Sequence, residues 1–333
     1  MKVVRRLEEL PLDLPHMVAT IGNFDGVHLG HQQLMRDLVE RAELIEGTPA
    51  IVTFHPHPLQ VLAPNNASRQ IQTLEQKLAI MEALGIRLAV VIPFTKELAQ
   101  TSARDFAVKI LKGKLKVQEI YVGPNFAFGH RREGSFNLLK EIGASQDFFV
   151  GRIHQVHFRG NRVSSTAVRQ ALVAGQVALA RRLLGRPFSL VGGIVHGAAI
   201  GTDIRVPTAN LRTANELLPR NGVYTSRLTI EGRRYGGVTN IGVRPTLTPD
   251  GSVSEQTIET HLLDFEGDLY GQAATLELLL YLREERRFEH TRALVNQISK
   301  DVVRARRYFG WFLRAVPGVK MENIPDSGRT PGA

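Results

Sequence analysis

Residues 22–31 read Gly-Asn-Phe-Asp-Gly-Val-His-Leu-Gly-His, and this stretch decides how the first half of the chain folds. It follows the apolar run 17–21, which predicts a short buried strand. It precedes a segment in which apolar residues recur at helical spacing from Leu34 to Ile45, which predicts an amphipathic helix. A helix N-terminus has free backbone N–H groups and the positive end of its dipole, so the strand, turn and helix together suit a phosphate group.

Two histidines stand at the start of this predicted helix. His28 and His31 are three residues apart, so they fall on the same side of its first turn. From there their imidazoles can donate hydrogen bonds to a triphosphate while charge builds on a leaving pyrophosphate. Gly22 and Gly26 permit a close approach to the backbone. The alternative is that both histidines only cap the helix, but the strand before, the helix after and the glycines between favour the phosphate site.

Composition narrows the class of protein. The chain has 333 residues, 43% of them hydrophobic, which is enough for two packed domains. It has no cysteine, which excludes disulfides, thiolate metal sites and a cysteine nucleophile. The N-terminus lacks the apolar core of a signal peptide and no apolar run reaches the ~18 residues of a membrane span, so we expect a cytoplasmic protein that does not bind membranes. The net charge of +10 favours an anionic partner, either a nucleic acid or a phosphorylated small molecule.

The first half of the chain alternates predicted strands with predicted helices. This alternation of continuously apolar strands with helices is typical of an α/β fold with a parallel sheet covered on both faces. Ligands of such sheets bind at the carboxyl ends of the strands. We therefore expect residues 55–58 and 123–129, which follow two of the strands, to line one cleft with residues 22–31. The further predicted strands lie at 50–54, 88–92 and 119–122.

Hydroxyl side chains precede another predicted helix at residues 163–169, Val-Ser-Ser-Thr-Ala-Val-Arg. They repeat the phosphate-binding pattern of a helix N-terminus, and Arg169 lies one turn inside, where it can reach the same anion. Taken alone, the stretch favours an ordinary N-cap by Ser165 or Thr166. The stretch 55–58, His-Pro-His-Pro, taken alone likewise favours a rigid proline turn.

The second half of the chain consists mainly of predicted strands and turns. Gly185-Arg186-Pro187 marks the end of the first domain, and the strands after it predict a mostly antiparallel small β-barrel. Residues 292–309 predict a closing helix. We therefore predict domains at 1–186 and 187–312, followed by a disordered tail at 313–333. The predicted strands of this half lie at 189–195, 223–230, 235–240, 257–263 and 274–282.

Three polar residues of the second half are candidates for chemistry. Thr208 and Asn210 are two apart in an extended segment, so they face the same way and can hold a cation that bears phosphates. Glu259 alternates with apolar Ile258 and Leu262; we expect it to point into the barrel, as a general base for a substrate hydroxyl. The alternatives are a proline turn and a solvent-facing strand glutamate, and from the residues alone they are at least equal.

A series of motifs runs along the chain: GNFDGVHLGH (22–31), TFHPHP (53–58), VGPNFAFG (122–129), SSTAVR (164–169), LLGRP (183–187), PTAN (207–210), NIGVRPT (240–246), ETHLLDF (259–265) and DLYG (268–271). In this order and spacing they resemble the bifunctional prokaryotic riboflavin kinase/FAD synthetase family. The His-x-Gly-His pattern also resembles the signature of the nucleotidyltransferase superfamily, which includes class I aminoacyl-tRNA synthetases. The resemblance implies a Rossmann-like nucleotidyltransferase domain followed by a riboflavin kinase barrel.

The resemblance implies two reactions. The C-terminal module phosphorylates the ribityl 5′-hydroxyl of riboflavin with ATP, giving FMN. The N-terminal module transfers AMP from a second ATP to FMN, giving FAD and pyrophosphate. Magnesium accompanies ATP, and since both reactions join polyanions, positioning and positive donors supply most of the rate. The predicted partners are thus riboflavin, FMN and ATP, with no nucleic acid.

The resemblance also assigns residues to these reactions. His28 and His31 are implied to be catalytic in adenylyl transfer, and Glu259 in the kinase, where it accepts the hydroxyl proton. Thr208 and Asn210 are implied to hold Mg²⁺-ATP. The remaining ATP-binding residues are Gly22, Asn23, Asp25, Gly26, Ser164, Ser165, Thr166 and Arg169, and the flavin-binding residues are His57, Asn125 and Arg244.

One segment departs from the family pattern. Before the Pro-Thr-Ala-Asn motif, Thr202 stands where an arginine is common and Arg205 where a glycine is common. An arginine takes the positive-φ conformations of glycine only at a cost, so either the backbone is ordinary here or Arg205 replaces the missing cation. A flavin-binding module with a decayed kinase half is therefore one alternative. The others are another His-x-Gly-His nucleotidyltransferase and, from charge alone, a nucleic-acid-binding protein.

Overall fold

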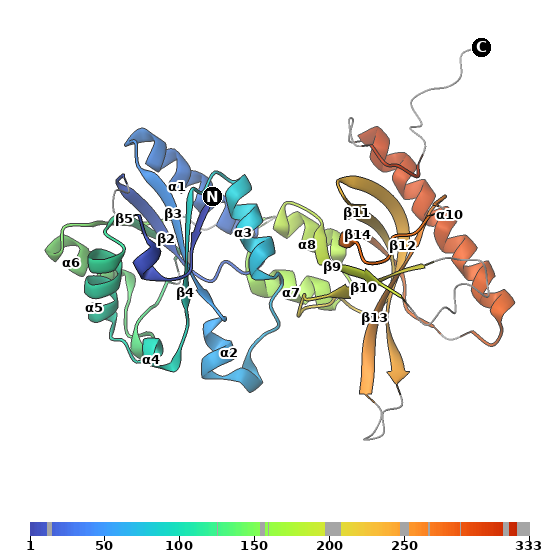
Figure 1. Ribbon diagram of the computed structural model, residues 1–333, viewed down its shortest axis with the longest axis horizontal. Helices are drawn as coiled ribbons and strands as arrows, with labels where there is room; N and C mark the ends of the chain where they lie inside the picture. The colour runs from blue at the N-terminus through green and yellow to red at the C-terminus, as the bar shows by residue number, and fades with distance from the viewer. Residues whose placement is uncertain are drawn as a thin grey trace, which may run out of the picture. The chain divides into compact units, whose positions relative to one another are not determined.

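The computed structural model describes residues 1–11, 15–124, 126–153, 157–158, 160–196, 208–246, 253–265, 267–286, 288–315 and 320–324. The chain divides into two compact units, Met1–Ser165 and Thr166–Ala333 (Figure 1). The first contains a parallel sheet with helices, and the second contains a closed antiparallel barrel followed by a helix. The predicted fold class is confirmed for both halves.

The first unit is built on a six-stranded, wholly parallel sheet with the strand order β1-β4-β3-β2-β5-β6. Its strands are β1 (Lys2–Val4), β2 (Met17–Ile21), β3 (Thr48–His55), β4 (Leu88–Pro93), β5 (Val117–Val122) and β6 (Phe149–Arg152). The helices are α1 (Leu29–Leu44), α2 (Pro58–Leu62), α3 (Leu74–Ala83), α4 (Lys96–Ala99), α5 (Ala103–Asp105), the π-helix η3 (Phe106–Lys114) and α6 (Phe136–Ser145). Short 3₁₀ turns lie at Leu7–Glu9, Pro64–Asn66 and His130–Arg132, and the hairpin β7 (His157–Phe158) and β8 (Asn161–Arg162) follows β6.

Both faces of this sheet are buried, which explains why its strands are continuously apolar. Successive side chains of a strand point to opposite faces. On β2, Ala19 packs in the cluster that includes η3 and α6, whereas Val18 packs in the cluster that includes α1 and α3. The helix starts follow local signals as well: Thr73 accepts a hydrogen bond from the Gln76 N–H at 3.2 Å, and the Gln76 side chain accepts one from the Thr73 N–H at 3.0 Å. This is the capping box that closes the start of α3.

The second unit contains a closed barrel with the strand order β10-β13-β12-β11-β14-β9. Its interior is filled by alternate residues of the strands, such as Leu190, Leu228 and Leu276, which are fully buried. Thr239 lies among them and hydrogen-bonds Ser226 at 2.6 Å and Thr260 at 2.8 Å. The elements are α7 (Ser165–Val173), α8 (Val177–Leu184), β9 (Phe188–Val195), β10 (Thr208–Thr213), β11 (Gly222–Ile230), β12 (Arg233–Thr246), β13 (Val253–Leu262), β14 (Ala273–Arg283) and α10 (Thr291–Ala315).

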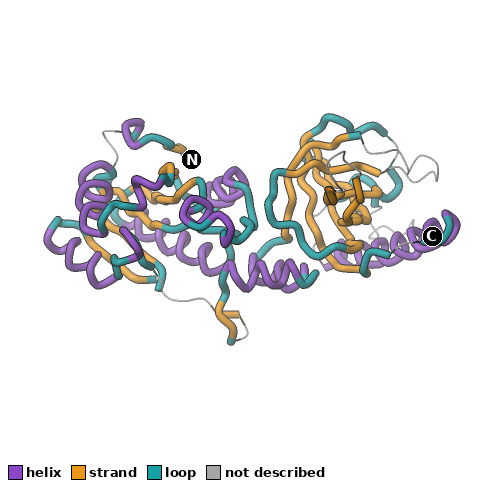
Figure 2. Tube along the Cα trace, turned by 90° about the horizontal axis from the view of Figure 1, so that it is seen from below, coloured by secondary structure: helices purple, strands orange, loops and turns teal. Residues whose placement is uncertain are grey.

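Helix α10 runs along the outside of the barrel (Figure 2). Its buried Ala305 and Phe309 pack on a patch of the outer barrel face that includes Val223 and Leu263. The helix continues to Ala315, beyond the predicted start of a disordered tail at 313. Asn323 is also buried: it accepts a hydrogen bond from the Gly236 N–H at 2.7 Å and donates one to the Gly236 carbonyl at 2.8 Å. The prediction of disorder is therefore wrong for 313–315 and 320–324, because composition does not reveal these backbone contacts.

Candidate active sites

A cavity of about 480 Å³ opens at the carboxyl ends of the strands of the first unit. Gly22, Asn23, His28 and His31 of the glycine-rich stretch line it, and so do residues 123–124 and 126–129 after β5. Two of the three predicted loops therefore meet in one cleft. The third, 55–58, contributes only Pro58.

The glycine-rich stretch has an unusual backbone. Phe24 and Val27 have positive φ angles of 48° and 37°, a region that non-glycine residues rarely adopt. Both side chains are buried, at 4% and 0% exposure, so core packing stabilises this conformation. Gly26, with a φ of 82°, lies between them. The turn thereby brings both histidines to the first residues of α1.

The two imidazoles stack on each other. Their ring centroids are 3.7 Å apart with an interplanar angle of 18°. His28 is the N-cap of α1, and its Nδ1 accepts a hydrogen bond from the His31 N–H at 3.3 Å. His28 therefore also caps the helix, as the alternative interpretation proposed, and its ring proton must reside on Nε2. His31 Nδ1 is buried without a hydrogen-bond partner among the described residues.

The surroundings of His31 keep its imidazole neutral. Burial, followed by the charges of His28 and Lys77, lowers the pKa of His31 well below its ordinary value. His31 therefore offers its ring N–H as a neutral hydrogen-bond donor, stacked against His28 at the positive end of a helix dipole. This arrangement suits the oxygens of a polyphosphate without requiring an imidazolium.

In the barrel, strand register brings the polar candidates together. Glu259 of β13 pairs with Asn210 of β10 on one side and with Asn240 of β12 on the other. Directly paired residues of a sheet share a face. Thr208 lies two residues from Asn210 and pairs with His261, so it shares that face as well.

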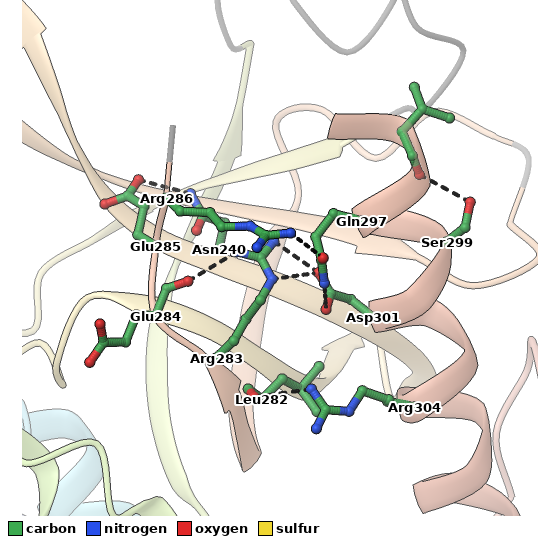
Figure 3. Close-up of polar contacts among 11 residues, drawn as sticks. Asn240, Leu282, Arg283, Glu284, Glu285, Arg286, Gln297, Ser299, Asp301 and Arg304 are labelled. Carbon is green, nitrogen blue, oxygen red and sulfur yellow. Dashed lines mark hydrogen bonds and ion pairs between the residues drawn. The ribbon is translucent and has the colours of Figure 1, made fainter. Parts of the chain in front are cut away.

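This shared face is the outer one. Ile258 and Thr260, which flank Glu259, are 3% and 1% exposed and belong to the filled interior. Leu263 follows Glu259 by four residues, so along an extended strand the two side chains face the same side. Leu263 packs in the cluster on the outside of the barrel that includes Phe309 of α10. The prediction that Glu259 points into the barrel is therefore wrong, since the alternate residues of β13 occupy the interior. Asn240 continues this face to the end of β14, where its Nδ2 contacts Glu285 Oε1 at 3.4 Å (Figure 3).

The comparisons with known proteins also divide the chain into two parts, one that contains the parallel sheet and one that contains the barrel. The FAD synthetase family model matches residues 11–167, and the riboflavin kinase family model matches residues 184–309. A bifunctional riboflavin kinase/FMN adenylyltransferase of Pseudomonas fluorescens is 40% identical over 306 residues, which are 92% of this chain and 97% of the relative. The protein of that name from Escherichia coli K12 is 37% identical over 93% of this chain and 98% of its own. This chain belongs to the bifunctional riboflavin kinase/FMN adenylyltransferase family.

A solved structure has the same fold along almost the whole chain. It covers 92% of this chain and 98% of its own with a TM-score of 0.82 and 26% sequence identity, and it is described as a macrolide-efflux protein from Streptococcus pneumoniae. In the described part of this chain, no helix is long and apolar enough to cross a membrane.

Asp25, which the family resemblance assigned to ATP, supports the glycine-rich stretch. Its carboxylate is 3% exposed, and its two oxygens accept the Ile71 N–H at 3.0 and 3.1 Å. Its backbone carbonyl accepts a hydrogen bond from the Ser165 hydroxyl at 2.7 Å. Asp25 and Ser165 therefore tie the stretch to its neighbours, whereas Ser164 lines the cavity.

Other predicted residues are less directly placed. His57 is the N-cap of α2: its Nδ1 accepts the Leu59 N–H at 3.2 Å, as the turn interpretation expected. Thr166 and Arg169 belong to α7 in the second unit, and their part in ATP binding stays a prediction. Asn125, Thr202 and Arg205 lie outside the described residues, as does the side chain of Arg244.

Sequence reasoning missed a buried lysine beside the histidines. Lys77 of α3 is 5% exposed, and its Nζ donates a hydrogen bond to the Asn23 carbonyl at 3.4 Å. It occupies an apolar position of the helix, in line with Leu74, Leu78 and Met81. A lysine in the apolar stripe of an amphipathic helix is the signal that points to it.

The aromatic wall of the cavity was missed as well. Phe126 and Phe128 stack with centroids 5.1 Å apart, and Phe106 lies 6.0 Å from Phe128. Such a wall suits a flat, apolar ring system. Further cavity residues that the sequence did not single out are Phe54, Phe94, Arg131, Arg132 and Arg162.

An ion-pair network attaches α10 to the end of β14. Asp301, at 1% side-chain exposure, accepts a hydrogen bond from Arg283 Nε at 2.9 Å and another from Gln297 at 2.9 Å (Figure 3). Arg286 bonds Gln297 in turn. The network fixes α10 beside the strand end from which Glu285 reaches Asn240.

Proposed function

We propose that the first unit adenylylates FMN and the second phosphorylates riboflavin, so that the chain converts riboflavin to FAD in two steps. The stacked His28–His31 pair at the N-terminus of α1, facing an aromatic-walled cavity, is the observation that supports this most strongly. The matches of the two family models to separate parts of the chain support the same division.

In adenylyl transfer, a phosphate oxygen of FMN attacks the α-phosphorus of ATP. The bond from that phosphorus to the bridging oxygen breaks, and pyrophosphate leaves with the electron pair. Ring N–H groups of His28 and His31, together with the first N–H groups of α1, donate to the phosphates and stabilise the leaving charge. The phenylalanine wall positions the flavin ring.

In the kinase reaction, the ribityl 5′-hydroxyl of riboflavin attacks the γ-phosphorus of ATP. The bond from that phosphorus to the β,γ-bridging oxygen breaks, and ADP leaves with the electron pair. Glu259 accepts the hydroxyl proton, and its neighbours Asn210 and Thr208 face the same side of the barrel. Their amide and hydroxyl oxygens are hard donors of the kind that Mg²⁺ accepts, so these residues fit a magnesium ion that arrives with ATP. Bound there, Mg²⁺ neutralises phosphate charge. Among the described residues, no three histidine, aspartate or glutamate side chains form a metal cluster.

The test is incubation of the purified protein with riboflavin, ATP and Mg²⁺, followed by chromatographic separation of the flavins. We expect FMN to appear first and FAD to follow, and EDTA to stop both. FMN without FAD would contradict the role of the first unit, and riboflavin left unchanged would contradict that of the second. A cytoplasmic location and the lack of nucleic-acid binding stay predictions.

A further inference from the structure

A short loop at the mouth of the first cavity is held firmly at its base. Phe128 and Gly134 exchange two backbone hydrogen bonds, of 3.1 and 2.8 Å, that close the loop. Between them, the His130 N–H donates to the Thr101 carbonyl at 2.9 Å. The Glu133 carboxylate accepts the Ala103 N–H at 2.8 Å. The loop is thus attached to the connection between α4 and α5, and its shape is fixed by contacts outside its tip.

The tip consists of two arginines with left-handed backbones. Arg131 and Arg132 have φ angles of 49° and 61°, and two consecutive non-glycine residues in this region are strained. Both line the cavity and both are exposed. Among the described residues, no carboxylate pairs with either guanidinium. Glu133, the adjacent acid, is instead occupied by the Ala103 N–H.

The loop also holds part of the aromatic wall, because Phe128 forms its first residue and Phe126 stacks on Phe128. The guanidinium groups of Arg131 and Arg132 therefore follow closely in the chain after Phe126 and Phe128, whose rings form the surface that suits a flavin ring. His28 and His31, by contrast, belong to the turn before α1. Paired guanidiniums are the side chains best suited to bind a phosphate group.

We propose that Arg131 and Arg132 bind the phosphate group of the flavin substrate and thereby select FMN for adenylylation. This assignment rests on the proposed function of the first unit. It also accounts for the strained loop: the backbone holds at the cavity two cations that no carboxylate of the described residues pairs with, and the phosphate of FMN supplies the missing negative charge.

The experiment compares Arg131→Asn/Arg132→Asn with the wild type, since asparagine tolerates a left-handed backbone while it removes both charges. FAD formation is measured with FMN varied at saturating ATP, then with ATP varied at saturating FMN. We expect the KM for FMN to rise at least tenfold and the KM for ATP to change less than twofold. Lumiflavin, which has the ring but no phosphate, should inhibit wild type and variant with equal Ki. Arg131→Lys/Arg132→Lys should recover part of the affinity for FMN.

The matched control is Arg87→Asn/Lys114→Asn, which removes two exposed cations that precede β4 and β5, at the opposite edge of the sheet. It should leave every constant within twofold of the wild type. A rise in the KM for ATP alone, or an equal weakening of lumiflavin, would overturn the assignment. Calorimetric titration with FMN needs no turnover: an unchanged affinity in the asparagine variant would overturn the assignment, whereas a wild type that binds FMN but forms no FAD would contradict only the proposed function.

Discussion

At the residue scale, the imidazoles of His28 and His31 stack with ring centroids 3.7 Å apart and both line the cavity, and we propose that they act on one phosphate chain. We predict that His28→Ala or His31→Ala lowers the rate of FAD formation from FMN by about 10²-fold or more, because a donor to the leaving charge is lost. Formation of FMN from riboflavin should continue at the wild-type rate, since it belongs to the barrel. Both rates can be followed by chromatography of the flavins.

The control for this prediction is His16→Ala. His16 is an exposed histidine of the same unit and contacts Glu119 at 3.7 Å. Its removal should change neither reaction. Equal loss of both activities in a folded His31→Ala protein would contradict the assignment of one reaction to each unit.

The lowered pKa of His31 also predicts a pH dependence of stability. In the unfolded chain this imidazole takes up a proton near its ordinary pKa of 6.5, whereas in the folded protein it stays neutral to lower pH. The contribution of His31 to the free energy of unfolding is therefore fully present above pH 6.5. Below that pH it falls by up to about 1.4 kcal/mol per pH unit, until the pKa of His31 in the folded protein is reached. His31→Gln should lose less stability than the wild type between pH 7.5 and 5.5 in urea unfolding. An equal loss of stability in His31→Gln and in the wild type over this pH range would contradict the role of His31 in the pH dependence.

At the element scale, strand β13 aligns Glu259 with Asn210 and Asn240 on the outer face of the barrel. We predict that Glu259→Gln stops FMN formation almost completely, because the hydroxyl of riboflavin loses its proton acceptor. Conversion of supplied FMN to FAD should stay near normal. Glu231→Gln, at the turn between β11 and β12, is the control and should affect neither step. FMN formation above a tenth of the wild-type rate would argue against Glu259 as the base.

Helix α10 depends on a buried charge pair. Asp301→Asn leaves the Arg283 guanidinium without its carboxylate, and we expect it to lower the free energy of unfolding by about 3 kcal/mol. Asp264 and Arg306 form an exposed pair, so Asp264→Asn should cost less than about 1 kcal/mol. Chemical denaturation, followed by the fluorescence of Trp311 on α10, measures both. If Asp301→Asn and Asp264→Asn lowered the free energy of unfolding equally, burial of the Arg283–Asp301 pair would not make it more important for stability than the exposed pair.

At the scale of the whole molecule, the sequence was informative where chemistry is local. Continuous apolar runs predicted the four central strands β2 to β5 but not the edge strands β1 and β6, and the histidine spacing predicted a pair on one side of α1. It failed where a contact depends on distant segments. Glu259 was assigned to the wrong face because strand pairing decides which side it takes. The left-handed backbone of Arg131 and Arg132 was missed because contacts outside the loop tip fix it, and arginine as a residue type does not indicate it.

The division of the chain gives a last prediction. The sequence predicts a domain boundary after Arg186, whereas the compact units divide between Ser165 and Thr166, so α7 and α8 group with the barrel. Val177, Ala180 and Leu184 of α8 are buried, Arg181 reaches the Tyr308 hydroxyl at 3.5 Å, and the Arg220 N–H bonds the Leu172 carbonyl of α7 at 3.0 Å. A fragment that starts at 187 exposes the surface that these helices cover.

We therefore expect a fragment of residues 166–333 to unfold at a clearly higher temperature than a fragment of residues 187–333, and to phosphorylate riboflavin at the rate of the full chain. Val177→Ser/Leu184→Ser in the longer fragment should reproduce the instability of the shorter one, because it removes apolar burial without shortening the chain. Val173→Ser, which changes an exposed apolar residue of α7, is the control and should have little effect. If both fragments unfold at the same temperature, α7 and α8 do not stabilise the barrel, and the boundary after Arg186 describes the kinase module better.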